Sequence, residues 1–178
     1  RSSFPPAMRK LMTGVLQDIL GDVDKDSIDE DILKFKKEMK TSDIQDIALP
    51  TGVKKLNKFK DKTPRDAVFT TMRKGTPVHV KAAWIYNDLL KYWGLNNFEK
   101  IKSSEKIKWV YLKPNTLNVK QIGFKGYDDP PKIMEFIKKN MDYDKLFTRA
   151  LEKKIRMFYE ALNWDMPVDK INTLERFF

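Results

Sequence analysis

Nine basic side chains that suit contact with nucleic-acid phosphates lie close together in the middle of this chain. We call them the basic cluster: Lys54, Lys55, Lys58, Lys60, Lys62, Arg65, Arg73, Lys74 and Lys81. Lysine carries a compact point charge, which suits contact with a phosphate backbone without readout of the base sequence. The cluster therefore predicts a surface for a polyanion, although a lysine-rich solvated face would have the same spacing.

The formal net charge of +10 is concentrated in one part of the chain. Residues 51–125 hold 17 Lys and Arg against 5 Asp and Glu, whereas residues 1–50 hold 8 against 10 and residues 126–178 hold 10 against 10. A basic block between two balanced flanks is typical of a surface that meets nucleic acid. We expect folding to bring the basic cluster onto one concave wall that follows a double helix.

Other kinds of chemistry have little support in the sequence. The chain has no cysteine and one histidine, so disulfides and thiolate metal sites are excluded. No glycine-rich phosphate loop, nucleophile elbow or His-Glu-x-x-His motif occurs. The acids of Asp22–Asp31 could serve a two-metal nuclease, or could be helix caps and first-turn charges. No apolar run approaches the roughly 20 residues of a membrane span, so we expect no membrane partner.

Hydrophobic spacing and breaker residues predict a helix-dominated α+β fold with a small antiparallel sheet between helices. Predicted helices begin at Pro5, at a capping box of Ser27 and Glu30, at Lys54, at Ala82, at Pro130 behind Asp128 or Asp129, and at Asp142. Predicted strands or extended segments are Ile44–Leu49, Val78–Val80, Lys106–Leu112 and Asn118–Phe124. The tryptophans could stack on bases, but their apolar neighbours favour packing in a core: Trp84, Trp93, Trp109 and Trp164.

The run Gly75–Asn87 (GTPVHVKAAWIYN) has a Pro-x-His-aliphatic-basic sequence that leads into a helix with a Tyr-Asn pair. It resembles the thumb domain of family B DNA polymerases from T-even-type bacteriophages. The matching positions are Pro77, His79, Val80, Lys81, Tyr86 and Asn87. Lys81 stands where the family commonly has arginine. Shorter similar segments follow the same order along the chain: Arg1–Ala7, Ile47–Ala48, Lys58–Phe59, Glu105–Lys113 and Met141–Tyr143.

The resemblance implies a thumb domain over residues 1–166, with its DNA-holding segment at 51–125 and a clamp-binding tail at 167–178. In such polymerases the thumb holds the backbone and minor-groove side of the primer–template duplex behind the active site. The resemblance therefore assigns the basic cluster and His79 to DNA contact, although an isolated histidine is more simply a structural residue. It implies no catalytic residue, metal ligand or cofactor in this segment, because the two magnesium ions belong to the palm of the parent nucleotidyltransferase.

The same resemblance implies three kinds of partner: duplex DNA, the phage sliding clamp, and the palm, fingers and exonuclease domains. It implies a phage-encoded protein in the cytoplasm of an infected bacterium. The palm's Asp-Thr-Asp-Ser motif does not occur in the 178 residues. We therefore expect the duplex-holding part of a replicative polymerase without its catalyst, either a piece or a subunit of a split enzyme. Arg1, in place of an initiator methionine, favours a piece.

The C-terminal residues have the spacing of sliding-clamp peptides, an aliphatic anchor followed by paired aromatics. The candidate clamp-binding residues are Ile171, Leu174, Phe177 and Phe178. The alternative is that the aromatic pair packs on its own core. Two other functions also stay open, namely a free-standing RNA- or single-strand-binding module and the small nuclease at Asp22–Asp31.

Overall fold

The computed structural model describes residues 4–169, and the chain falls into two compact units. Among the described residues, unit 1 comprises Ala48–Asp142 with residues 4–5, and unit 2 comprises Pro6–Ile47 with residues 143–169. Helices dominate, and one three-stranded antiparallel sheet accompanies them, so the predicted α+β class is confirmed.

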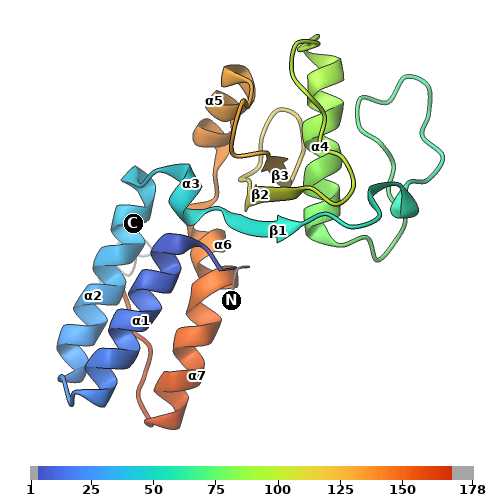
Figure 1. The fold of residues 1–178 in the computed structure, drawn as a ribbon. Coiled ribbons are helices and arrows are strands. Elements are labelled where there is room, and N and C mark those ends of the chain that lie inside the picture. The colour runs from blue at the N-terminus through green and yellow to red at the C-terminus, as the bar shows by residue number, and fades with distance from the viewer. Residues whose placement is uncertain (1–3, 170–178) are drawn as a thin grey trace, which may run out of the picture. The chain divides into compact units, whose positions relative to one another are not determined.

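Unit 2 is built from helices (Figure 1), and their buried apolar side chains form its core. They are α1 (Pro6–Leu20), α2 (Lys25–Glu38), the 3-10 turn Met39–Thr41, α3 (Ile44–Ile47), α6 (Tyr143–Phe147), the π-helical stretch Thr148–Glu152 and α7 (Lys153–Ala161). Side chains at helical spacing point inward, because three- and four-residue steps share a helix face. The buried set includes Met8, Met12, Ile28, Ile32, Leu151, Ile155 and Tyr159.

Unit 1 contains the sheet and the basic cluster. The strands β1 (Leu49–Gly52), β2 (Lys106–Tyr111) and β3 (Gln121–Phe124) pair in that order, and Trp109 lies opposite Leu49 on one side and Gly123 on the other. Helix α4 (Val78–Tyr92) packs against β3 and β2. The 3-10 turn Leu56–Phe59 and α5 (Pro131–Asn140) complete the unit.

Helix α4 approaches β3 so closely that only small residues fit at the crossing. Ala82 and Ala83 are fully buried on the helix. A Cβ added to Gly123 would lie 3.2 Å from Ile107 Cδ1 and 3.3 Å from the carbonyl carbon and oxygen of Ala82. Since the opposing atoms of Ala82 are helix backbone, they cannot move as a side chain could. Glycine at 123 therefore sets the separation of helix and sheet.

Two predicted extended segments are wrong. Ile44–Leu49 contains the helical turn α3, because Ile44 and Ile47 are both buried at a three-residue step and the Asp43 side chain accepts the Gln45 amide. Val78–Val80 is the first turn of α4, since a proline restricts the residue before it and not those that follow. The Val80 and Lys81 amides donate to the Pro77 carbonyl, so Pro77 is the N-cap residue that precedes the helix.

The predicted helix caps also need correction. Asp24, and not Ser27, caps α2, because its carboxylate accepts both the amide and the hydroxyl of Ser27. Pro130 precedes α5 at the N-cap position, while Asp129 accepts the amides of Lys125 and Gly126 in the preceding turn. Acidic residues near a helix start can thus serve a neighbouring turn.

The Gly123→Ala substitution should destabilise unit 1 by about 1–3 kcal/mol, the usual cost of overpacking a tight contact. Urea denaturation followed by tryptophan fluorescence measures this change. Gly52→Ala is the matched control in the same sheet, because no atom lies within 4 Å of its added Cβ. Equal effects of the two substitutions would show that the α4–β3 approach does not limit the size of the residue at position 123.

Candidate nucleic-acid interface

A loop that carries part of the basic cluster leaves the 3-10 turn and returns beside α4 (Figure 1). Its base is a short ladder, in which Lys60 bridges Met72, the Asp61 amide donates to the Thr71 carbonyl over 2.8 Å, and the Arg73 amide donates to the Phe59 carbonyl over 2.9 Å. The ladder closes the loop at both ends. We call the enclosed residues loop 62–70.

Loop 62–70 is fastened to α4 by one carboxylate. Asp88 accepts the Thr70 amide at Oδ2 (2.8 Å) and the Thr70 hydroxyl at Oδ1 (2.9 Å), a pair that we call the Thr70–Asp88 latch. Burial raises the pKa of Asp88 above its ordinary value, while the bonds from Thr70 and the charges of Lys60 and Lys91 lower it to a lesser extent. The latch holds a long loop against a rigid helix.

The side chains of the basic cluster are accessible, and one of them, Lys60, acts on Asp88 through its charge. Eight are exposed, and Lys81 is half-buried on α4. Among residues 4–169, none of the nine has a carboxylate within ion-pair distance. Lys58 lies 5.4 Å from the Phe59 ring centroid and Lys60 lies 5.2 Å from that of Trp84, contacts that leave the positive charge available. These cations can therefore meet phosphates.

Two hollows in unit 1 bring some of these residues together. The loop-side hollow, about 560 Å³, has Lys60, Arg65 and Lys91 in its lining. The second hollow, about 290 Å³, has Lys81 in its lining together with Lys120 from the connection of the β2–β3 hairpin, and we call it the hairpin-side hollow. The other predicted DNA contacts border neither hollow: Lys54, Lys55, Lys58, Lys62, Arg73, Lys74 and His79. The cluster is thus distributed over the 3-10 turn, loop 62–70, the Arg73–Lys74 turn and α4.

His79 differs from its basic neighbours in charge. It lies in the first turn of α4 and is half-buried, and this burial lowers its pKa below the ordinary value of 6.5. The imidazole is therefore neutral at pH 7 and can donate or accept a hydrogen bond.

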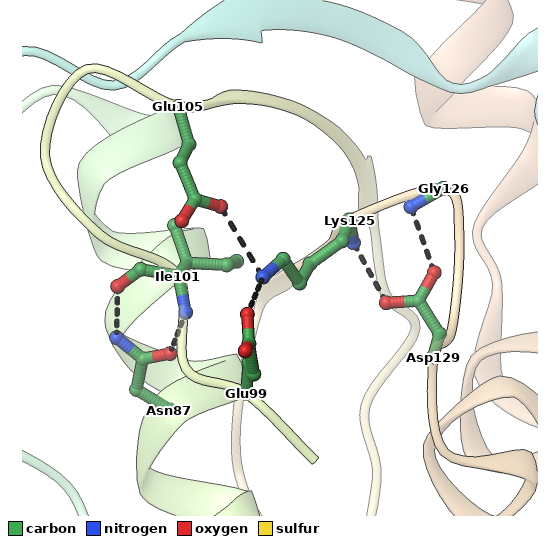
Figure 2. A network of polar contacts seen from close by, with 7 residues as sticks. All are labelled: Asn87, Glu99, Ile101, Glu105, Lys125, Gly126 and Asp129. Carbon is green, nitrogen blue, oxygen red and sulfur yellow. Dashed lines mark hydrogen bonds and ion pairs between the residues drawn. The ribbon is translucent and has the colours of Figure 1, made fainter.

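Lys125, also within residues 51–125, serves the interior (Figure 2). Its side chain is only 4% exposed, and its ammonium lies 3.4 Å from Glu105 Oε2 and 3.7 Å from Glu99 Oε2. A buried ammonium needs such carboxylates to offset its lost hydration. A count of basic and acidic residues along the sequence does not reveal this pairing. The sequence feature that indicates a buried Lys125 is its position directly after the apolar strand β3.

The Tyr-Asn pair of the resemblance has a structural role. The Asn87 side chain donates to the Ile101 carbonyl over 2.9 Å and accepts the Ile101 amide over 2.7 Å (Figure 2). Tyr86 is fully buried, and this burial, followed by the nearby charge of Asp129, raises the pKa of its hydroxyl well above the usual range. Both residues fix α4 within unit 1.

The remaining candidate residues have other surroundings. Of the acids at Asp22–Asp31, Asp24 caps α2 and Asp29 Oδ1 accepts the Tyr159 hydroxyl over 2.6 Å. The four tryptophans are half-buried, and three make edge-to-face ring contacts, namely Trp93 with Phe136, Trp109 with Tyr111, and Trp164 with Tyr159. The candidate clamp-binding residues lie outside the described residues: Ile171, Leu174, Phe177 and Phe178.

Comparison with known proteins gives no family for this chain. No family model matches the sequence. A stretch of 61 residues is 37% identical to the putative human protein SSX9, and it covers 34% of this chain and 32% of that protein. The chain thus spans about a third of the length of this relative. Over residues 4–169, no helix combines the length and the apolar character that a membrane crossing requires.

The Thr70–Asp88 latch should control the order of loop 62–70. Asp88→Ala removes two hydrogen bonds to a carboxylate, so trypsin cleavage after Lys62 and Arg65 should accelerate by roughly tenfold or more. Asp88→Asn is the matched control, because an amide can accept the Thr70 amide and donate to its hydroxyl. The latch would be refuted if the two variants were cleaved at the same rate.

Proposed function

We propose that this chain is the thumb portion of a phage replicative DNA polymerase, which holds the primer–template duplex by its phosphate backbone. The observation that carries the proposal is the set of nine cations at Lys54–Lys81, which have no carboxylate partner among residues 4–169 and lie on a unit with a fixed scaffold. The similarity of Gly75–Asn87 to the thumb of T-even-type family B polymerases supports it.

The arrangement of charges is suited to backbone contact and not to base readout. Lysines predominate over arginines in the basic cluster, and a lysine contacts phosphate as a point charge without bidentate recognition of a base edge. A replicative enzyme must bind every sequence that it copies, so such contacts fit the role. Four of the five acids within residues 51–125 have described partners: Asp61 accepts the Lys62 backbone amide, Asp88 forms the latch, and Glu99 and Glu105 pair with Lys125. None of these four carboxylates lies within ion-pair distance of a side chain of the basic cluster.

Under this proposal the catalytic residues and the two magnesium ions belong to the palm of the parent polymerase. The partners are duplex DNA, the palm, fingers and exonuclease domains, and the sliding clamp, in the cytoplasm of an infected bacterium. A flexible connection to a clamp would raise the local concentration of polymerase at the primer end without any new contact to DNA.

Binding of the 178-residue chain to a DNA duplex should weaken steeply with salt. If about five phosphates are neutralised, log K falls against log salt concentration with a slope of roughly −4 to −5. The double variant Lys62→Ala/Arg65→Ala should make this slope less steep by about two, because each cation releases about one counterion. Fluorescence anisotropy across a salt series measures it.

The matched control is Lys37→Ala, an exposed lysine on α2 outside the basic cluster, which should leave the slope unchanged. Two results would contradict the proposal. One is an unchanged slope in the double variant. The other is tighter binding of single-stranded DNA or RNA than of the duplex, which would favour a single-strand-binding module.

Deletion of residues 173–178 should abolish association with the phage sliding clamp and leave duplex binding intact. The tail supplies the aliphatic anchor Leu174 and the aromatic pair Phe177 and Phe178, whereas the basic cluster lies in unit 1. Surface plasmon resonance on immobilised clamp tests the first statement, and anisotropy with duplex tests the second. An equal loss of both activities would mean that the tail supports folding and does not bind a clamp.

A further inference from the structure

The hairpin-side hollow is formed by three segments of unit 1. The first segment supplies Phe69 of loop 62–70 and Met72 of the ladder at its base. Helix α4 supplies Lys81 and Trp84, and the connection between β2 and β3 supplies Val119 and Lys120. Its volume of about 290 Å³ is at the lower end for ligand sites, which suits one flat ring system better than a larger molecule.

Hydrogen bonds hold each wall of this hollow in place. Trp84 Nε1 donates to the Leu56 carbonyl over 2.9 Å, which fixes the indole ring. Thr70 of the latch follows Phe69 in the sequence, and both Thr70 and Asp88 contribute to the same lining. The Asn115 side chain donates to the Val119 carbonyl over 2.7 Å and fixes the third wall. A preformed hollow binds its ligand with little cost for ordering side chains.

The lining combines the groups that a nucleotide requires. Phe69, Met72, Trp84 and Val119 offer apolar and aromatic surface for a base, and base stacking on aromatic side chains is a common mode of nucleic-acid binding. Lys81 and Lys120 place two cations beside that surface, where the phosphates of the same strand would lie. This complementarity of charge favours a nucleotide over an apolar peptide.

We propose that the hairpin-side hollow receives one unstacked nucleobase of the bound DNA, with Lys81 and Lys120 contacting the adjoining phosphates. The inference rests on the proposed function, because it requires that unit 1 binds DNA. It adds a site that senses whether a base near the duplex end is paired. A paired base stays in its stack and cannot enter, whereas an unpaired base loses little by leaving.

The test compares two duplexes with the 178-residue chain. One has a fully paired end, and the other ends in a single unpaired 2-aminopurine, whose fluorescence falls when the base stacks. The duplex with the unpaired base should bind at least about fivefold tighter, the lower limit of stacking on an aromatic side chain, with quenched fluorescence. Phe69→Ala should remove both effects without weakening the paired duplex, and Phe69→Tyr should retain them.

Tyr127→Ala is the matched control, since Tyr127 is an exposed aromatic residue of unit 1 outside the hollow lining, and it should leave the preference unchanged. Binding of both duplexes with equal affinity, or a preference that persists in Phe69→Ala, would overturn the nucleobase site and leave the proposed function intact. Failure of the wild-type chain to bind either duplex would overturn both proposals.

Discussion

The close approach of helix α4 to strand β3 is the constraint on which the rest of unit 1 depends. Gly123 and Ala82 leave no room for a larger side chain at the crossing, so the helix has one position over the sheet. From this fixed helix, Lys81 and Trp84 reach the hairpin-side hollow, Asn87 holds the Ile101 backbone, and Asp88 fastens loop 62–70. If α4 could slide along the sheet, none of these side chains would stay in contact with its partner.

The charges of unit 1 divide into two kinds according to their surroundings. Lys125 is buried and paired with Glu99 and Glu105, so its charge is balanced inside the protein. The basic cluster is accessible and has no carboxylate partner among residues 4–169, so its charge is directed to whatever meets that surface. Acidic residues are scarce in this part of the sequence, and Asp88, Glu99 and Glu105 all have internal roles. This division explains how unit 1 can keep a strong positive field although it also contains acidic residues.

Most of the helices could be predicted, whereas several boundaries could not. The apolar stripes of α1, α2 and α4 repeat every three to four residues, a pattern that packing reinforces. The turn at Ile44–Ile47 is too short for periodicity to distinguish helix from strand, and its two isoleucines fit either. The start of α4 lies directly after Pro77, where a run of three residues is too short for periodicity to distinguish the first turn of a helix from a strand.

The sequence by itself determined the α+β class, the location of the excess positive charge and the absence of thiolate chemistry, because composition and periodicity do not depend on distant contacts. Only the tertiary structure decided which lysines lie beside a carboxylate. It paired Lys125 with acids 20 and more residues away in the chain, joined Thr70 to Asp88, and formed the hollow between loop 62–70, α4 and the hairpin. These outcomes depend on side chains that meet only after α4 has packed on the sheet, and no local pattern in the sequence encodes that meeting.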